Sequence, residues 1–391
     1  MGDTAAAIQE LKAILSERLS TSPSVIDLHA RDEAHHPYTP PDAVAFPETT
    51  QEVSEIVKVC ARHRVPVVPW GVGTSLEGHA LAVRGGITVD TSRMKSMVEV
   101  APEDLYCVVQ PGITREEVNT ELRATGLFFP IDPGANATIG GMTATRASGT
   151  MAVRYGTMKD NVLALEVVLA DGRVIRTGSR AKKSSSGYDL TRLFVGSEGT
   201  LGIITELTLK LYGTPEAMAA AVCEFDSTGG AVDAVIEAVQ MGLPAARMEY
   251  VDAASIRAIN AYSQMTMAEK PHLFMEFHGS ETSVAEDAAR MAEIVADHGG
   301  GGFQWTSKPE ERTKLWHARH TAYFAMKATK PGAIGISTDV CVPISKLAQA
   351  ITDTVADVEA HGWPAPIVGH VGDGNYHCLF LFDPDSDDDL K

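Results

Sequence analysis

The stretch that decides the fold runs from Val65 to His79 and reads V-P-V-V-P-W-G-V-G-T-S-L-E-G-H. Its first part predicts a short buried strand from Val65 to Pro69, where prolines punctuate the valines. Gly71, Gly73 and Gly78 follow, so the backbone can turn sharply and direct several N–H groups at one point. Such a loop suits a phosphate group, although an ordinary turn explains this stretch equally well when it is considered alone.

Two further glycine-rich segments follow, P-G-A-N-A-T-I-G-G-M-T-A-T-R-A-S-G from Pro133 to Gly149 and V-G-S-E-G-T-L-G-I-I-T from Val195 to Thr205. A single dinucleotide-binding βαβ unit would need only one G-x-G-x-x-G, with an acidic residue about 20 positions later. The first loop lacks the third glycine of that fingerprint in register. The pattern favours a long pyrophosphate-containing cofactor that lies across several loops.

Composition indicates a globular protein of two domains. A chain of 391 residues is long for one core, and its 44% hydrophobic and 21% charged residues are ordinary for globular proteins. The formal net charge of -18 argues against nucleic acid or an anionic membrane as a general partner. An anionic substrate must therefore bind at a locally positive site.

The N-terminus has early acidic residues and no apolar core of signal-peptide length, and no stretch reaches the roughly 18 apolar residues of a membrane span. We therefore expect a cytoplasmic protein, with peripheral docking on a membrane left open. The cysteines are odd in number and scattered, which favours free thiols in a reducing compartment. They are Cys60, Cys107, Cys223, Cys341 and Cys378.

Hydrophobic periodicity places helices and strands along the chain. It predicts helices at Ala5–Leu19, Thr49–Ala61 with Thr50 as N-cap, Thr114–Thr125, Val284–His298 and Lys308–Lys327. It also predicts a hairpin of Asn161–Leu169 with Arg173–Thr177, and nearly continuous loop from Gly126 to Gly149. A composition change at Tyr212–Glu216 marks a domain boundary, followed by further α and β elements.

Several of these motifs occur together in one known superfamily. The three glycine-rich segments, R-Y-G-T-M-K-D-N at Arg154–Asn161 and G-Y-D-L-T-R-L-F at Gly187–Phe194 resemble the PCMH-type FAD-binding domain of the vanillyl-alcohol oxidase/p-cresol methylhydroxylase flavoproteins. The chain is most similar to the cytochrome-type D-lactate dehydrogenases of that superfamily, which are relatives of glycolate oxidase and D-2-hydroxyglutarate dehydrogenase. The resemblance covers about Pro37 to Asp385.

The resemblance implies an α+β fold in three parts. Residues 1–36 form an N-terminal helix and lead-in, and residues 37–213 form a PCMH-type FAD-binding domain with two subdomains. Residues 214–391 form an FAD-linked oxidase C-terminal or cap domain, ferredoxin-like with an antiparallel sheet, and incomplete.

It also implies non-covalent FAD, because relatives that tether FAD through histidine carry that residue about where Thr74 stands. His79 is off that position, so we expect it to be structural. The expected cofactor residues are Trp70, Gly71, Gly73, Thr74 and Ser75 at the pyrophosphate, Pro133, Gly134, Gly140, Gly141, Ser148 and Gly149 around the isoalloxazine and ribityl, and Glu198, Gly199, Gly202 and Ile203 near the adenine.

Two histidines near the end of the chain are candidate metal ligands. In I-V-G-H-V-G-D-G-N-Y-H-C, a tight turn at Asp373-Gly374 would place His370 opposite His377, with Cβ atoms about 4.5–5.5 Å apart. Spacing alone leaves hydrogen-bonded core histidines as the alternative. The resemblance implies that both bind a divalent metal, of which Zn, Mn and Fe remain open.

The segment W-H-A-R-H-T-A-Y offers a positive partner for a substrate carboxylate. On a helix, Trp316, Arg319, His320 and Tyr323 would share one face, and Arg319 could form a bidentate clamp. A solvated surface arginine is the alternative. The resemblance implies that Arg319 is the substrate-binding arginine.

The function implied is FAD-dependent oxidation of a D-2-hydroxy acid, foremost D-lactate to pyruvate. The Cα hydrogen leaves as hydride to the flavin, the metal orients the substrate and lowers its hydroxyl pKa, and a cytochrome or quinone accepts the electrons. The family's G-E-H-G segment, with a third metal ligand and a probable base, does not occur before Lys391, so we expect a fragment or a truncated form.

Other functions stay open at this point. The chain could act on glycolate or D-2-hydroxyglutarate, or serve as a non-catalytic flavin subunit of a glycolate oxidase-like complex. An NAD-dependent dehydrogenase fits the glycine pattern least. We expect no nucleic acid partner and leave a homodimer open.

Overall fold

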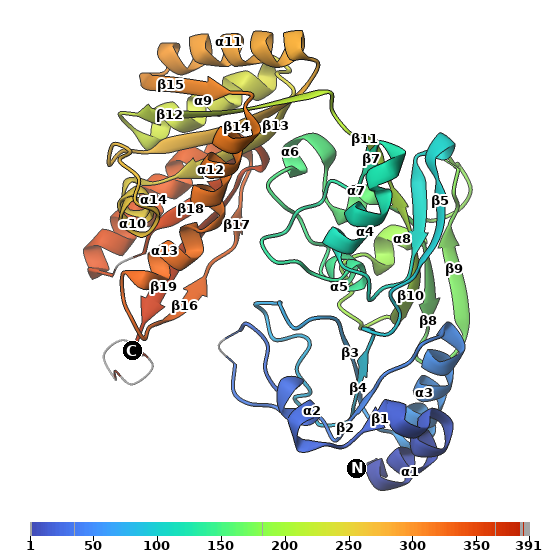
Figure 1. The fold of residues 1–391 in the computed structure, drawn as a ribbon. Helices are drawn as coiled ribbons and strands as arrows, with labels where there is room; N and C mark the ends of the chain where they lie inside the picture. Colours follow the sequence, from blue (N-terminus) through green and yellow to red (C-terminus); the bar gives the residue numbers. More distant parts are fainter. Residues whose placement is uncertain (1, 35, 182, 364, 384–385, 387–391) are drawn as a thin grey trace. The chain divides into compact units, whose positions relative to one another are not determined.

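The computed structural model describes residues 2–34, 36–181, 183–363, 365–383 and 386 (Figure 1). The chain divides into two compact units. The N-terminal unit consists of Met1–Gly149 and Gly156–Thr214, and the C-terminal unit consists of Thr150–Tyr155 and Pro215–Lys391. Both units combine helices with β-sheets, so the predicted α+β class is confirmed.

The N-terminal unit contains three sheets and several short helices. Its helices are α1 (Thr4–Leu15), α2 (Pro23–Leu28), α3 (Thr50–His63), α4 (Arg115–Leu122), α5 (Ile139–Ala144), α7 (Met158–Asn161) and α8 (Leu190–Phe194). Its strands are β1 (Leu19–Ser20), β2 (Ala43–Ala45), β3 (Val67–Trp70), β4 (Ile87–Asp90), β5 (Met97–Ala101), β6 (Tyr106–Val109), β7 (Leu127–Phe128), β8 (Val162–Val168), β9 (Val174–Gly178), β10 (Ile203–Lys210) and β11 (Tyr212–Gly213).

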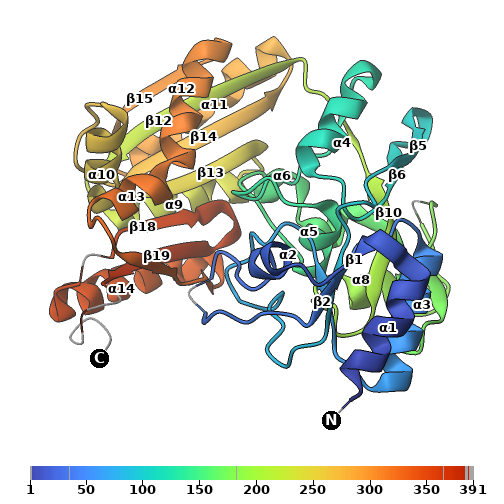
Figure 2. The same cartoon turned by 60° about the horizontal axis from the view of Figure 1, so that its bottom comes forward.

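A four-stranded sheet in the order β1-β2-β4-β3 carries the first glycine loop at its edge strand. Strands β2 and β3 both pair parallel with β4, and α3 connects β2 to β3 as parallel strands require. The buried side of α3 includes Val53, Ile56, Val57 and Cys60, the stripe that its periodicity predicts. Figure 2 shows α1 beside α3, and Leu11 and Leu15 of α1 belong to the same core.

The cap of α3 differs from the sequence prediction. Thr49, and not Thr50, is the N-cap, since its hydroxyl accepts a hydrogen bond from the Glu52 N–H at 3.2 Å. Thr50 is already helical, and its hydroxyl donates to Glu166 of β8 at 2.6 Å. Two adjacent threonines offer the same hydroxyl, and only the tertiary partner decides which one caps the helix.

The other two sheets of this unit are a five-stranded antiparallel sheet, in the order β5-β6-β10-β8-β9, and the pair β11-β7. The predicted hairpin is present as β8 and β9, with Val168 paired to Val174. The segment from Gly126 to Gly149, predicted as nearly continuous loop, also contains the short strand β7 and helix α5. Thr138 caps α5 by accepting from the Gly141 N–H, a local signal within the second glycine-rich segment.

The C-terminal unit is built on one large antiparallel sheet in the order β15-β12-β14-β13-β18-β19-β16, with β17 paired to β19. Its helices are α6 (Ala152–Tyr155), α9 (Thr228–Gln240), α10 (Ala253–Ser263), α11 (Glu281–Asp297), α12 (Pro309–His320), α13 (Ala322–Ala328) and α14 (Leu347–His361). Its strands are β12 (Ala217–Phe225), β13 (Ala245–Val251), β14 (His272–Gly279), β15 (Gly300–Thr306), β16 (Ile334–Ser337), β17 (Val340–Cys341), β18 (Ile367–His370) and β19 (Asn375–Phe382).

The two faces of this sheet bury different residues, because side chains alternate along each strand. One face packs against α9, α11 and α14 and contributes side chains such as Met248, Tyr250 and Cys378 to the largest core. The other face packs against α10, α12 and α13 with Val251, Phe274 and other apolar residues. The same alternation directs Arg247 and Glu249 of β13 to this second face.

The helix predicted over Lys308–Lys327 is two helices, α12 and α13, which meet at Thr321. The Thr321 hydroxyl donates to the His317 carbonyl at 2.8 Å. A threonine that bonds back to the carbonyl four residues earlier often bends a helix. At Thr321 the backbone is no longer helical, with φ -84° and ψ 0°.

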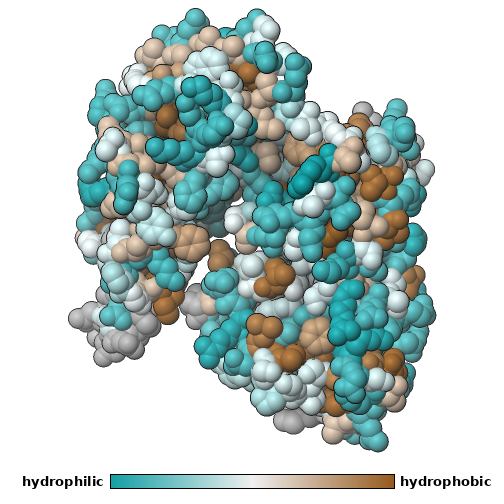
Figure 3. Space-filling model, in the orientation of Figure 1, coloured by the Kyte–Doolittle hydropathy of each residue, from teal (hydrophilic) through white to brown (hydrophobic). Residues whose placement is uncertain are grey.

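On the face drawn in Figure 3, hydrophobic side chains form small separate groups among hydrophilic ones. Among the described residues, no helix has the length and apolar character needed to cross a membrane. Of the cysteines, Cys341 is exposed and the other four are buried, all with free thiols, and burial raises the pKa of each buried thiol to about 12.

The cap of α3 leads to a test of local stability. Thr49→Ala removes the acceptor of the Glu52 N–H, and we expect helix α3 to lose about 1 kcal/mol, equivalent to roughly fivefold faster amide exchange. Hydrogen exchange followed by mass spectrometry on α3 peptides measures this change. Thr49→Ser keeps the hydroxyl and serves as control. Equal exchange in the alanine and serine variants would contradict the assignment.

Candidate functional site

The three glycine-rich segments meet within the N-terminal unit. A side chain at Gly71 would lie 2.4 Å from the Thr138 hydroxyl, and one at Gly199 would lie 2.5 Å from Pro69. The third segment is also tied to the second by backbone hydrogen bonds, from the Glu198 N–H to the Ala144 carbonyl and from the Gly196 N–H to the Thr143 carbonyl, each 3.0 Å. Segments far apart in sequence therefore form one continuous loop surface.

The first loop has the geometry of an anion cradle. Gly73 has φ +68°, and a side chain there would contact the Trp70 ring at 2.6 Å. Within the described residues, the backbone N–H groups of Gly73, Thr74 and Ser75 donate to no protein acceptor. Backbone donors without partners, at a site where a side chain does not fit, match the needs of a pyrophosphate.

Some of the expected cofactor residues have buried side chains. The Trp70 ring packs on His29 at 4.9 Å between centroids, and Ile203 lies in the core beside Val168. Their backbones remain near the loops, but their side chains are core. A side chain at Gly149 would lie 2.5 Å from Asp132, and one at Gly140 would lie 2.5 Å from Pro111, so both glycines permit close packing.

Other members of the predicted set lie at the surface of the loops. The Glu198 carboxylate lies 3.8 Å from His79, whose Nδ1 is 3.2 Å from the Ser75 hydroxyl. These contacts give His79 a structural role in linking the first and third segments. The remaining members of the set are exposed or partly buried: Pro133, Gly134, Gly141, Ser148 and Gly202.

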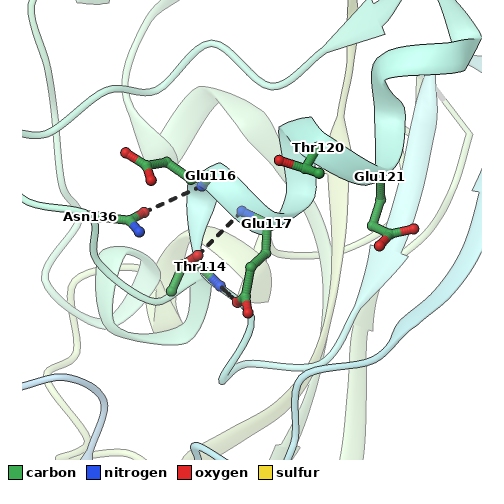
Figure 4. A pocket seen from close by; sticks show the side chains of 6 residues that line it. All are labelled: Thr114, Glu116, Glu117, Thr120, Glu121 and Asn136. Carbon is green, nitrogen blue, oxygen red and sulfur yellow. Dashed lines mark hydrogen bonds between the residues drawn. The ribbon is translucent and has the colours of Figure 1, made fainter.

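A hollow of about 360 Å³ lies beside helix α4 (Figure 4). Figure 4 shows Thr114 and Glu117 joined by two hydrogen bonds at the N-terminus of α4. It also shows the Asn136 side chain, which accepts a hydrogen bond from the Glu116 N–H. Its lining includes the acids Glu116, Glu117 and Glu121 and no basic residue. This charge disfavours a phosphate, so we do not place the cofactor there.

The C-terminal unit brings His370 and His377 together, but not in the predicted register. His370 pairs with Asn375, and His377 pairs with Val368, so the two histidines are diagonal neighbours. The turn is longer than expected because Val371–Asp373 forms a 3-10 turn that ends at Gly374, with φ +75°. The prediction of directly opposite histidines was wrong, and the two rings still approach to 5.4 Å between centroids.

Both imidazoles are held through Nδ1. The Nδ1 of His370 lies 2.7 Å from Glu249 Oε1, and that of His377 lies 2.9 Å from the Thr338 carbonyl. Neither acceptor can donate, so each Nδ1 carries the proton in these contacts. Each Nε2 makes no hydrogen bond to the described residues, which leaves both free to bind a ligand.

Arg319 joins this cluster through the same carboxylate. Its Nη2 donates to Glu249 Oε2 at 2.6 Å, and Glu249 is completely buried. Arg319 is only 9% exposed, which excludes the solvated surface arginine considered above. Its Nε–H is buried and has no acceptor among the described residues.

The predicted helix face around Arg319 is only partly correct. Trp316 is buried like Arg319, and the Arg247 guanidinium lies 4.5 Å from the centre of its ring. His320 is exposed, and Tyr323 lies beyond the break at Thr321 with 38% exposure. The break puts Tyr323 on a different helix from Arg319, which a continuous helical pattern cannot anticipate.

The pKa values of the two histidines are shifted in opposite directions. Burial alone would raise the pKa of Glu249, but the charges of His370 and Arg319 outweigh it and hold the pKa below its ordinary value. Burial lowers the pKa of His370, but Glu249 more than compensates and raises it. Burial, with the neighbouring His370 charge, lowers the pKa of His377. His377 is thereby favoured as a neutral imidazole, the form that binds metals.

The two imidazoles suit a metal as part of a ligand set. Most protein sites for transition metals provide at least three ligands. Among the residues that the structure describes, no group of three or more His, Cys, Asp or Glu side chains is placed to hold an ion. His370 and His377 therefore supply two imidazole donors, and the described residues supply no third.

A second buried ionic cluster lies on the same sheet face. Glu276 accepts from His278 Nε2 at 2.7 Å and lies 3.4 Å from Arg247, while Tyr155 contacts His278 Nδ1 at 2.9 Å. This cluster attaches helix α6 to the sheet, together with Arg154, which donates to the His278 carbonyl at 2.8 Å. It repeats the Glu–His–Arg composition of the Glu249 cluster.

Glu249 is not among the residues that the sequence predicted for the site. The signal was present in A-R-M-E-Y-V, where Arg247 and Glu249 alternate with Met248 and Tyr250 in a strand. Charged residues at alternate positions of a buried strand need partners on one face. Nothing in the sequence identifies those partners as His370 and Arg319, because they are 121 and 70 residues away.

Family models match both parts of the chain. The model described as "FAD binding domain" matches residues 41–178, and the model described as "FAD linked oxidases, C-terminal domain" matches residues 214–391. The loop surface described above lies partly within the first match, and Glu249, Arg319, His370 and His377 lie within the second.

Curated relatives include dehydrogenases of D-lactate. The chain is 49% identical to the probable mitochondrial D-lactate dehydrogenase of Danio rerio, over 96% of this chain and 76% of that protein. It is 44% identical to the mitochondrial D-lactate dehydrogenase [cytochrome] of Arabidopsis thaliana, over 98% and 68%. It is also 35% identical to the glycolate oxidase subunit GlcD of Bacillus subtilis, over 90% and 75%.

Solved structures agree at the level of the fold. An alkyldihydroxyacetonephosphate synthase matches with a TM-score of 0.80 and 19% identity, covering 99% of this chain and 78% of that one. A p-cresol methylhydroxylase matches with a TM-score of 0.76 and 16% identity, covering 97% and 82%. The sequence matches show that the chain belongs to the family of FAD-linked D-lactate dehydrogenases.

Proposed function

We propose that this protein oxidises a D-2-hydroxy acid, foremost D-lactate to pyruvate, with FAD as cofactor and a cytochrome as electron acceptor. The observation that carries the proposal is the cluster in which one buried carboxylate holds both Arg319 and His370, with His377 beside them. Membership of the D-lactate dehydrogenase family supports the substrate and the acceptor.

In this proposal the FAD is bound non-covalently and, when bound, accepts the substrate Cα hydrogen as a hydride. The chain's contribution is to hold the pyrophosphate on the N–H groups of Gly73, Thr74 and Ser75. Thr74 occupies the position where a tethering histidine would stand. His79 is engaged with Ser75 and Glu198, which favours a structural role over flavin attachment.

Arg319 binds the substrate carboxylate in this proposal. Its ion pair with Glu249 fixes one side of the guanidinium, and the substrate carboxylate would accept from N–H groups that do not contact Glu249. A charge-assisted bond in a buried site is stronger than one in water, so this contact orients the acid and offsets the repulsion from the overall charge of -18.

His370 and His377 bind a divalent metal through Nε2 in this proposal, with zinc, manganese and iron all compatible with imidazole. Such an ion would bind substrate oxygens and lower the pKa of the hydroxyl. The Nδ1 contacts to Glu249 and Thr338 orient the two rings, a second layer of bonds that metal-binding histidines commonly make.

A glycolate oxidase-like subunit is the second candidate function. The 35% identity with subunit GlcD supports it, whereas the higher identity with two D-lactate dehydrogenases favours the first. D-2-Hydroxyglutarate stays within the proposal as an alternative substrate that the same assay can separate, and quinone as acceptor and a cytoplasmic location stay as further alternatives.

The first prediction concerns the substrate. With the protein purified and saturated with FAD and Mn²⁺, anaerobic D-lactate should bleach the flavin absorbance, and L-lactate should not, because the proposed chemistry is specific for the D-enantiomer. Glycolate and D-2-hydroxyglutarate complete the panel. Bleaching by glycolate alone would favour the second function, and no bleaching by any acid would overturn the proposed oxidation.

The second prediction concerns Arg319. Arg319→Lys keeps the charge but not the planar fork, so kcat/KM for D-lactate should fall by roughly 10–100-fold, mainly through KM. The matched control is Arg257→Lys on α10, where Arg257 is exposed and pairs with Glu269 at 2.8 Å. Equal kcat/KM in both variants would contradict a role for Arg319 in carboxylate binding.

The third prediction concerns the glycine loops. Gly71→Ala places a Cβ 2.4 Å from the Thr138 hydroxyl and should lower the FAD retained after gel filtration several-fold, measured as flavin released into the supernatant on boiling. Adding Thr138→Ala removes that oxygen and should restore part of the FAD. Gly213→Ala, where a Cβ meets nothing within 4 Å, is the control. Full retention in Gly71→Ala, or flavin that stays with the boiled protein, would contradict the proposal.

A further inference from the structure

Glu249 is at the centre of the ionic cluster formed with His370 and Arg319. Its carboxylate is completely buried, and both of its oxygens are occupied by groups of different proposed function. Oε1 accepts from His370 Nδ1 at 2.7 Å, and Oε2 accepts from Arg319 Nη2 at 2.6 Å. One side chain therefore contacts both the proposed metal ligand and the proposed carboxylate clamp.

The position of Glu249 is set by the sheet. Glu249 of β13 lies directly opposite His370 of β18 in the antiparallel ladder. Directly opposite residues have Cβ atoms about 4.5–5.5 Å apart, so the carboxylate and the imidazole meet without any loop having to move. Arg319 reaches the same carboxylate from α12, which packs on this face.

We propose that Glu249 is a positioning residue: its carboxylate keeps the proton of His370 on Nδ1, so that Nε2 is left as a metal donor, and at the same time fixes Arg319. This inference rests on the function proposed above. It adds that the two substrate-binding groups share one buried acceptor.

The chemistry of an amide at this position shows why the carboxylate is required. A carboxylate accepts from both neighbours, whereas the amide introduced by Glu249→Gln has one accepting oxygen and one donating NH₂. Arg319 can only donate, so the amide oxygen turns to Arg319 and the NH₂ faces His370. His370 must then accept at Nδ1, its proton moves to Nε2, and the metal donor is lost.

A matched control lies in the same sheet. Glu276 is also buried, at 4% exposure, and accepts from His278 at 2.7 Å with Arg247 at 3.4 Å. Glu276→Gln therefore disturbs a Glu–His–Arg cluster of the same composition that lacks the proposed metal ligands. A purely structural role for Glu249 predicts that the two glutamine variants behave alike.

The first experiment measures metal binding by the complete protein without substrate. Mn²⁺ alone is titrated, and free Mn²⁺ is followed by electron paramagnetic resonance. We expect Glu249→Gln to raise the Mn²⁺ dissociation constant by roughly 10–100-fold, the range for loss of a bond that orients a metal-binding histidine. Glu276→Gln should leave it within about twofold of the wild-type value, because no proposed metal ligand contacts Glu276. Equal affinities in the two variants would overturn the proposal.

A double variant sharpens this test. Adding Arg319→Met to Glu249→Gln removes the donor that competes for the amide oxygen, so that oxygen can turn to His370. We expect Mn²⁺ affinity to recover by several-fold relative to Glu249→Gln alone. A further loss of affinity would show that the cluster acts only by holding the fold, and would overturn the proposal.

The second experiment reads the His370 proton directly in metal-free protein. Nitrogen-15 spectra of the histidine rings are recorded at a pH high enough for His370 to be neutral, with the His370 signals identified by their loss in His370→Asn. They should show a protonated Nδ1 with an unprotonated Nε2 in the wild type, and the reverse in Glu249→Gln. A wild-type His370 with an unprotonated Nδ1 overturns the proposal even if Glu249→Gln does not fold. If the wild type binds no Mn²⁺, the metal part of the proposed function fails, and these spectra still decide the role of Glu249.

Discussion

A buried carboxylate must be compensated, and that constraint organises the C-terminal unit. Glu249 has no exposure to solvent, so its charge is tolerated only with strong partners. His370 and Arg319 are those partners, at 2.7 and 2.6 Å. Removing Arg319 would take away the cation that compensates the charge, and removing His370 would leave one carboxylate oxygen without its hydrogen bond. The Glu249 carboxylate therefore ties β13, β18 and α12 together in addition to their apolar packing.

The apolar parts of the same sheet explain why the charged cluster stays ordered. On the opposite face, Met248 and Tyr250 lie in a continuous core between the sheet and α9, α11 and α14. On the cluster's own face, Val251, Phe274 and Trp316 pack beside the charges. Strand alternation alone separates these two environments, since adjacent residues of β13 point to opposite faces.

In the N-terminal unit the corresponding constraint is steric. Gly71 lies against Thr138, Gly199 against Pro69 and Gly149 against Asp132, each at a distance that no side chain could occupy. The glycines let three loops pack against one another, and within the described residues the backbone N–H groups of Gly73, Thr74 and Ser75 donate to no protein acceptor. Their spacing along the sequence thus reflects loop-to-loop packing as much as contact with a cofactor.

The sequence alone determined the features that depend on local composition. The resemblance carried by the glycine-rich segments indicated the FAD-binding domain. Helical periodicity predicted the buried stripe of α3, and the pattern of Asn161–Leu169 with Arg173–Thr177 predicted the β8–β9 hairpin. These succeed because turns, strands and amphipathic helices are specified by neighbouring residues. Residue type and the family resemblance also sufficed to select His370, His377 and Arg319 as candidate site residues. Only the tertiary structure decided what depends on distant partners. The hairpin register made His370 and His377 diagonal because the turn has a 3-10 segment, and Thr321 divided a helix that periodicity makes continuous. Thr49 rather than Thr50 became the cap because Glu166 engages Thr50. Glu249 was not predicted because its partners, His370 and Arg319, are 121 and 70 positions away in the sequence. A sequence pattern does not show which charged residues a fold will bury together.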